Sequence, residues 1–126
     1  MQLLLDTNAL LWLLDGDDRI GASTRAAVEG ADALTVSVVS LWEIAIKVSI
    51  GKLAPIPGLH ATIASLGFQR LPIADAHLVA LEGLPHVHRD PFDRLLVGQA
   101  LVERLTVLTT DRVLAQYSIP VLDARS

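Results

Sequence analysis

The sequence of 126 residues contains no cysteine, and only 4% of its residues are aromatic. Without cysteine, the chain cannot form a disulfide framework, a thiol nucleophile or a thiolate-bound zinc site. No apolar run approaches the roughly 20 residues of a membrane-spanning helix. The N-terminus has no basic region, and it reaches the carboxylate of Asp6 too early for a signal peptide. We therefore expect a cytoplasmic protein with no membrane partner.

Basic residues are also scarce, since 10 Lys and Arg stand against 14 Asp and Glu and give a net charge of −4. This balance argues against a broad basic surface for nucleic acid. It does not exclude an enzyme that acts on nucleic acid, because bound divalent cations can reverse the local charge of an acidic site. Hydrophobic residues make up 52% of the chain. This apolar excess suggests a hydrophobic face that is reserved for another chain.

Short apolar strands alternate with helices along the chain, and no repeat, low-complexity tract or linker interrupts them. The residue patterns predict strands at residues 3–5, 34–38, 68–71, 105–108 and 120–122. They predict helices at residues 9–14, 23–29, 41–49, 75–82, 91–104 and 111–117, and a further helix that ends near residue 66. A serine is expected to cap the helix at residues 23–29, and Asp75 is expected to cap the helix that stops at Gly83. The sequence therefore predicts an α/β fold, with one domain over residues 1–126. Its mostly parallel central sheet would have about four to five strands flanked by helices.

Four acidic residues from distant parts of the chain are predicted to meet at one edge of this sheet. Asp6 follows the first strand, and Asp111 follows the strand at residues 105–108. Glu43 and Asp93 lie in the first turn of predicted helices, whose N-termini lie at the same edge as the strand C-termini. Clustered carboxylates repel one another unless a cation holds them. Because the donors are all oxygen atoms, the cluster favours Mg²⁺ or Mn²⁺.

Each acid also has a purely structural interpretation. Glu43 fits the acidic position of a capping box that begins at Ser40, and Asp90 and Asp111 fit helix N-caps. Taken singly, these residues favour the capping interpretation. Asp6 differs, because a carboxylate directly after a buried strand needs partners that offset its desolvation. The two interpretations are compatible, since a cap can also aim a metal ligand.

Histidine and tryptophan residues carry less weight. His86 and His88 have a spacing that could bind metal, but they lie in a loop flanked by proline, where they are expected to be exposed. We predict that they are not a ligand pair. Trp12 and Trp42 are expected to fill the core rather than to stack on bases, and His77 is expected at a helix surface or the core edge.

Four sequence blocks resemble the successive motifs of PIN-domain nucleases, in the same order and over nearly the whole chain. They are LLLDTNALLW at residues 3–12, SLWEIAIK at 40–47, HRDPFDRLL at 88–96 and LTTD at 108–111. The most similar branch is the VapC-like toxins of bacterial toxin–antitoxin pairs. This resemblance implies an endoribonuclease that depends on Mg²⁺ or Mn²⁺. It also implies a cognate antitoxin protein as partner, an RNA substrate and a homodimer.

The resemblance implies that one or two ions are held by four catalytic acids, Asp6, Glu43, Asp93 and Asp111, without a protein nucleophile. Candidates for orienting ligands or water are Thr7, Asn8, Asp90 and Thr110, of which Asp90 is also a candidate extra ligand. Candidates for phosphate contacts are Lys47, Arg89, Arg94 and Arg112.

Two other functions remain open at the level of the sequence. The first is a PIN-like module that binds RNA or a protein partner without cutting, although such a module should have lost one or more of the acids. The second is a structure-specific DNA nuclease, which the short chain disfavours because it has no room for DNA-binding insertions.

Overall fold

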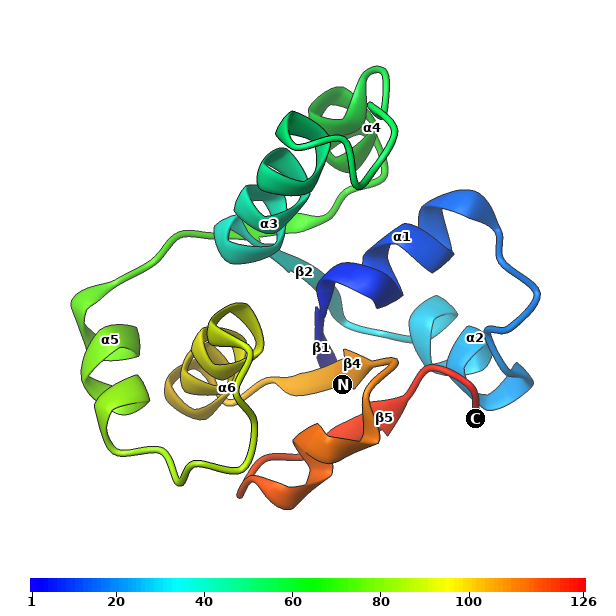
Figure 1. Ribbon diagram of the computed structural model, residues 1–126. Coiled ribbons are helices and arrows are strands. Elements are labelled where there is room, and N and C mark those ends of the chain that lie inside the picture. Colours follow the sequence, from blue (N-terminus) through cyan, green and yellow to red (C-terminus); the bar gives the residue numbers. More distant parts are fainter.

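The computed structural model describes residues 1–126, and a five-stranded parallel sheet with helices on both faces forms its centre (Figure 1). The strand order is β3-β2-β1-β4-β5. The strands are β1 (Gln2–Leu5), β2 (Ala33–Ser37), β3 (Gln69–Leu71), β4 (Thr106–Thr109) and β5 (Val121–Asp123). The helices are α1 (Thr7–Asp15), α2 (Ala22–Glu29), α3 (Val38–Ser49), α4 (Leu59–Ser65), α5 (Asp75–Glu82), α6 (Pro91–Glu103) and the 3₁₀ helix η1 (Arg112–Gln116). The predicted α/β fold with a parallel sheet is confirmed.

Strand β1 lies at the centre of the sheet, and its leucines are fully buried on both faces. Leu3 and Leu5 belong to a core with residues of α1, α3 and α4. Leu4 belongs to the opposite core, which is built largely from α6. A central parallel strand must be apolar on both faces, and this explains the run of three leucines in the sequence.

Helices α5 and α6 form a tightly packed pair on one side of the sheet (Figure 1). Gly98 permits this packing, because a Cβ atom at this position would lie 3.0 Å from the carbonyl oxygen of His77. The helices of this fold lack the length and apolar character that crossing a membrane requires.

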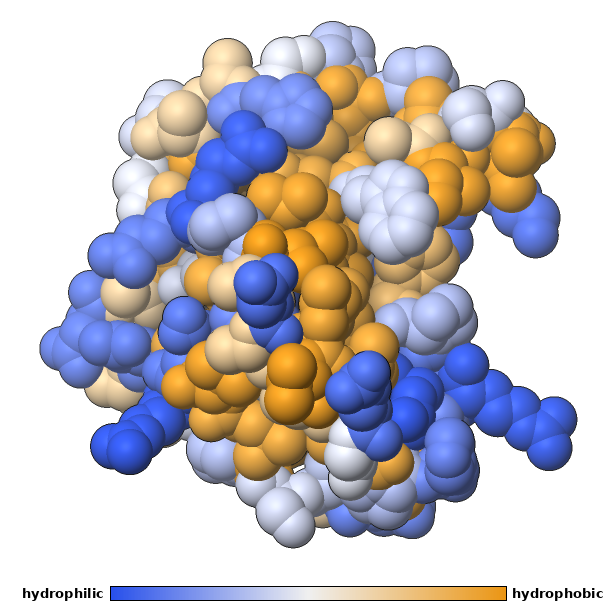
Figure 2. All heavy atoms as spheres, turned by 90° about the vertical axis from the view of Figure 1, so that its left-hand side faces the viewer, coloured by the Kyte–Doolittle hydropathy of each residue, from blue (hydrophilic) through white to orange (hydrophobic).

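Exposed apolar side chains are concentrated on α5 and α6 and just before them. This face, called the α5–α6 face below, carries Ile73, Leu78, Val79, Leu101 and Val102. Figure 2 views the molecule from this side and shows a broad hydrophobic area with hydrophilic side chains around its margin. The apolar excess of the composition therefore lies partly on the surface, as the sequence suggested.

Helix α3 begins earlier than predicted, and Ser37 rather than Ser40 is its N-cap. The Ser37 hydroxyl accepts a hydrogen bond from the Val39 N–H at 3.0 Å and donates one to Gln99 Oε1 at 2.6 Å. The predicted capping box is therefore wrong. Ser40 lies inside the first turn, where its hydroxyl is buried without a hydrogen-bond partner, and Glu43 lies in the second turn.

Two other predicted caps differ from the structure. Gly21 is the N-cap of α2, so the expected serine cap is absent. Asp75 is the first residue of α5 rather than its cap, since Ala74 occupies that position and its N–H donates to His77 Nδ1 at 3.0 Å. His77 is fully buried, more deeply than a surface or core-edge residue.

Candidate active site

The carboxyl edge of the sheet and the start of α6 enclose a pocket of about 210 Å³ that has no hydrophobic lining residue. It is lined by Asp6, Thr7, Asn8, Glu43, Lys47, His88, Asp90, Asp93, Thr110 and Asp111. The structure therefore brings together the four acids that the sequence placed at this edge, and with them all four predicted orienting residues.

Asp6 is buried between β1 and the start of α1, and both of its carboxylate oxygens accept hydrogen bonds. Oδ1 caps α1 by accepting from the Ala9 N–H at 2.7 Å. Oδ2 accepts from the Thr109 hydroxyl and from the Thr110 N–H. Burial raises the pKa of Asp6, hydrogen bonds offset part of this rise, and the neighbouring Glu43 adds to it. Thr109 was missed by the sequence analysis, although it ends the strand beside β1.

Glu43 extends from α3 into the pocket and is also buried. The Thr7 hydroxyl donates to its Oε1 at 2.6 Å, and the Lys47 ammonium lies 2.7 Å from its Oε2. Lys47 is one helical turn further along α3, so the helix itself sets this ion pair. Thr7 and Lys47 therefore hold the Glu43 carboxylate in one orientation.

Asp90 and Asp93 have different surroundings, although both lie at the start of α6. Asp90 Oδ1 accepts hydrogen bonds from the N–H groups of Phe92 at 2.8 Å and Asp93 at 3.2 Å, so Asp90 is the helix cap. Asp93 accepts no backbone hydrogen bond, and the nearest basic atom to its Oδ2 is His88 Nε2 at 3.3 Å. Of the two, Asp93 has its carboxylate free to bind a ligand.

The surroundings of Asp93 disfavour its negative charge. Burial raises its pKa, and the nearby carboxylates of Asp90, Asp6 and Glu43 raise it further; His88 lowers it in part, and the resulting pKa is about 7. Such a group releases its proton readily when a cation arrives.

Asp111 lines the same pocket and caps η1, with Oδ1 accepting from the Val113 N–H at 3.0 Å. Its Oδ2 lies 2.7 Å from His88 Nε2. Burial alone would raise the pKa of Asp111, but the hydrogen bonds from Val113 and His88 outweigh it and lower the pKa below its usual value.

His88 is a pocket residue that the sequence analysis discounted. Its side chain is only 18% exposed, so the expectation of an exposed loop residue is wrong. Tertiary contacts account for the difference, because Tyr117 Oη accepts the His88 backbone N–H at 2.9 Å and draws the loop inward. His86 is exposed and does not line the pocket.

Of the four predicted phosphate contacts, only Lys47 lines the pocket. Arg89 is exposed outside the lining residues. The Arg94 guanidinium donates to the Pro85 carbonyl at 2.9 Å and to Tyr117 Oη at 3.3 Å, so it stabilises the loop before α6. Arg112 pairs with Asp123 at 2.8 Å.

The two tryptophans have different environments. Trp12 is buried as predicted, and the guanidinium of Arg19 lies 4.2 Å from the centre of its ring. Trp42 is 53% exposed, so the expectation that it fills the core is wrong. It makes an edge contact with Phe92, with ring centres 5.2 Å apart, because its position on α3 faces the start of α6 rather than the sheet.

The donor set of the pocket fits a hard divalent cation. Single donor atoms of His88, Asp93 and Asp111 lie within 4.8 Å of one another, and Asp6 and Glu43 add carboxylates to the same pocket. One lysine does not balance this negative charge, and burial together with the neighbouring carboxylates raises the pKa of Asp93. Carboxylate oxygens in this number are the ligands that Mg²⁺ and Mn²⁺ prefer.

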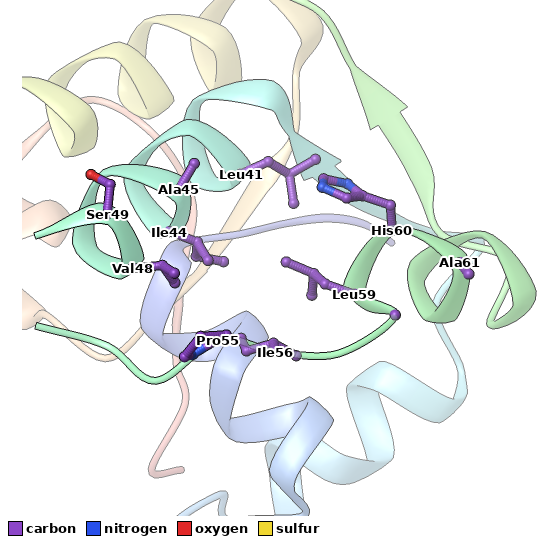
Figure 3. A pocket seen from close by; sticks show the side chains of 11 residues that line it. Leu41, Ile44, Ala45, Val48, Ser49, Pro55, Ile56, Leu59, His60 and Ala61 are labelled. Carbon is purple, nitrogen blue, oxygen red and sulfur yellow. The ribbon is translucent and has the colours of Figure 1, made fainter. Parts of the chain in front are cut away.

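A second concavity, of about 480 Å³, lies between α3 and the segment that leads into α4. Figure 3 shows Leu41, Ile44 and Val48 of α3 on one side of it, with Ile56 and Leu59 opposite. It contains no acidic residue. This apolar groove is therefore chemically distinct from the acidic pocket.

Comparisons with known proteins agree with this architecture. Residues 3–120 match the profile of the family described as PIN domain. A search of curated protein sequences finds no match. The solved structures with similar folds include VapBC2 of Rickettsia felis bound to a DNA fragment from its promoter. Its TM-score is 0.75 at 15% sequence identity, with 98% of each chain covered.

FitAcB of Neisseria gonorrhoeae has a TM-score of 0.71 at 17% identity, with 97% of each chain covered. A toxin–antitoxin complex from Klebsiella pneumoniae has a TM-score of 0.67 at 19% identity, again with 97% of each chain covered. At these identities the likeness establishes a shared fold. The family profile spans nearly the whole sequence, and this chain belongs to the PIN domain family.

Proposed function

We propose that this protein is an endoribonuclease dependent on Mg²⁺ or Mn²⁺ and that it acts in the cytoplasm as the toxin of a toxin–antitoxin pair. The observation that carries the proposal is the convergence of Asp6, Glu43, Asp93 and Asp111 from distant parts of the chain in one polar pocket. These four residues would hold one or two cations. No protein nucleophile is required, because water is the attacking group in such a hydrolysis.

A cation held by these acids would supply positive charge that attracts the phosphodiester and would increase the acidity of the attacking water. The residues of the chain orient the other groups. Thr7 and Thr109 hold the carboxylates of Glu43 and Asp6 by hydrogen bonds. The ammonium group of Lys47 lies at the pocket, where it would attract an RNA phosphate. Asn8 and Thr110 line the pocket and could orient water or substrate there.

The proposed partners are a cognate antitoxin and a second copy of the chain. The structural neighbours include toxin–antitoxin complexes, which supports the first partner. The apolar groove beside α3 and the α5–α6 face both leave hydrophobic surface exposed, which supports burial by other chains.

The test of the proposed chemistry compares Asp93→Asn with Asp90→Asn. Asp93→Asn nearly preserves volume and polarity but removes the charge that holds a cation. Its rate of RNA cleavage should fall at least about 100-fold, equivalent to about 3 kcal/mol. Asp90→Asn should have a much smaller effect, because asparagine caps a helix about as well as aspartate. The measurement is single-turnover cleavage of labelled RNA in Mn²⁺, with circular dichroism to show that both variants are folded.

The same assay separates the alternatives when single-stranded RNA, structured RNA and flap DNA are compared with and without Mn²⁺. Cleavage of RNA that requires Mn²⁺ is the expected result. RNA binding without cleavage by the wild type would favour a binding module, and preferential cleavage of flap DNA would favour a DNA nuclease. Loss of activity in Asp90→Asn but not in Asp93→Asn would reverse the assignment of the third acid.

A further inference from the structure

The imidazole ring of His88 is fixed by the backbone on one side of the pocket. Its Nδ1 accepts a hydrogen bond from the Asp90 N–H at 2.9 Å, and its own backbone N–H donates to Tyr117 Oη. Tyr117 is buried and its hydroxyl also accepts from Arg94. Asp90 and Tyr117 thus set the position of the ring, and Arg94 supports Tyr117.

These contacts determine where the ring carries its proton. A ring nitrogen that accepts a hydrogen bond cannot itself be protonated, so Nδ1 is bare and the ring proton resides on Nε2. That Nε2–H donates to Asp111 Oδ2 at 2.7 Å, and Asp93 Oδ2 lies 3.3 Å from the same nitrogen without accepting a hydrogen bond from it. In this tautomer Nε2 has no lone pair for a cation.

We propose that His88 is a positioning residue whose Nε2–H holds the Asp111 carboxylate in place beside Asp93, and that it is not a metal ligand. The inference rests on the proposed function, because it assigns a role toward the cation of the same pocket. Asp111 Oδ1 is held by the Val113 N–H and its Oδ2 by His88, so the carboxylate plane is fixed at both oxygens. Asp93 has no backbone donor, and His88 is the basic group nearest to it.

The competing role is that of a direct metal ligand. The Nε2 atom and one carboxylate oxygen each of Asp93 and Asp111 lie within 4.8 Å of one another, close enough for all three to bind one cation. Ligation would require the proton to move from Nε2 to Nδ1. The protonated Nδ1 would then face the Asp90 N–H, so two donors would meet and the ring would have to turn away. The two roles therefore differ in whether Nε2 keeps its proton when the cation binds.

The first experiment follows the imidazole nitrogens of ¹⁵N-labelled wild-type protein by NMR during a Mg²⁺ titration. We expect the His88 signals to show the Nε2–H tautomer before Mg²⁺ is added and to keep it at saturation, while the backbone signals of Asp93 and Asp111 shift. Loss of the Nε2 proton on Mg²⁺ binding would identify His88 as a ligand and overturn the proposal.

The second experiment measures Mn²⁺ affinity by electron paramagnetic resonance in His88→Ala, His88→Gln and the control His86→Gln. His88→Ala should bind Mn²⁺ roughly 10- to 100-fold more weakly, the usual cost of losing a hydrogen bond that orients a ligand. His88→Gln should recover much of the affinity, because its amide N–H₂ can donate near the position of Nε2. His86→Gln should bind as the wild type does, since His86 is exposed and outside the pocket.

The outcomes distinguish this inference from the proposed function. If the wild type binds Mn²⁺ and cleaves RNA, and His88→Ala binds Mn²⁺ equally well, the positioning role is wrong and the nuclease proposal stands. If the wild type binds neither Mg²⁺ nor Mn²⁺, the metal-dependent function fails and the positioning role fails with it.

Discussion

At the scale of single residues, the four acids of the pocket are stabilised to very different degrees. Asp6 accepts three hydrogen bonds, Glu43 is held by Thr7 and Lys47, and Asp111 has donors at both oxygens. Asp93 accepts no hydrogen bond from the backbone. Its pKa is raised to about 7 by burial and by repulsion from the neighbouring carboxylates. The other three acids are therefore held in place by the protein itself, whereas Asp93 is the one that depends most on a cation.

This difference predicts a pH dependence of stability in the absence of metal. The pKa of Asp93 rises from the ordinary aspartate value of 3.8 to about 7 in the folded protein. Between these values the folded chain holds a proton that the unfolded chain has lost, so the free energy of unfolding falls as pH rises from about 4 to about 7. The raised pKa of Asp6 acts in the same direction. Urea unfolding in EDTA at a series of pH values measures this slope.

Two controls belong to this experiment. Asp93→Asn should reduce the slope, because the amide does not titrate, and at pH about 8 it should be at least as stable as the wild type in EDTA. Saturating Mg²⁺ should stabilise the wild type more at high pH than at low pH, because cation and proton compete for the same carboxylates. A free energy of unfolding in EDTA that rises through this pH window would contradict the environment assigned to Asp93.

At the scale of the elements, the sequence predicted every strand and every helix because their signals are local. Leu3, Leu4 and Leu5 mark a buried strand, and Asp90 followed by Pro91 marks the start of α6. The start of α3 was mispredicted because two serines compete for it. Ser37 is the cap because its hydroxyl also reaches Gln99, a residue 62 positions away, and local sequence does not report such a contact.

The two serines provide a matched pair of substitutions. Ser37→Ala removes the cap of α3 and leaves the buried Gln99 carbonyl without its donor, so it should lower the free energy of unfolding by about 1–3 kcal/mol. Ser40→Ala removes a buried hydroxyl that has no partner, so it should be neutral or stabilising. Urea titration of the two variants measures both effects. Equal destabilisation by both substitutions would contradict the assignment of the cap.

The candidate site was predictable to the extent that it follows from topology. Parallel strands end at one edge of the sheet and the crossover helices begin there, and these two rules brought Asp6, Glu43, Asp93 and Asp111 together. They could not identify His88, which enters the pocket because Tyr117 and Asp90 hold its loop. They also could not exclude Arg94 as a phosphate contact. The Arg94 guanidinium donates to the Pro85 carbonyl in the loop before α6 and is therefore not directed at the pocket.

At the scale of the whole molecule, acidic and apolar surfaces are kept apart. The pocket at the carboxyl edge of the sheet has no hydrophobic lining, whereas the groove beside α3 and the α5–α6 face are largely apolar. The α5–α6 face lies on a tightly packed helix pair, and its apolar side chains could be buried against the same face of a second copy.

We therefore expect the isolated chain to form a dimer through the α5–α6 face. Val79 is 66% exposed on this face, and Val79→Glu should weaken the dimer because a carboxylate would be buried in an apolar contact. Leu66→Glu is the control, since Leu66 is 59% exposed at the end of α4, away from this face. Small-angle scattering over a range of concentrations measures the dimer. A wild-type monomer at high concentration would contradict the expectation.

The central position of β1 has a consequence for the newly made chain. Leu5 pairs with Leu108 in the sheet, and Asp6 accepts a hydrogen bond from the hydroxyl of Thr109, a residue 103 positions later in the sequence. These contacts of high sequence separation form only after the intervening chain can fold back. A nascent polypeptide that stops short of β4 therefore has Asp6 with its Ala9 cap contact, but without the Thr109 and Thr110 donors that hold Oδ2. The first acid to be synthesised is among the last to be put in place, and under the proposed function a growing chain should not cut RNA while it is still being translated.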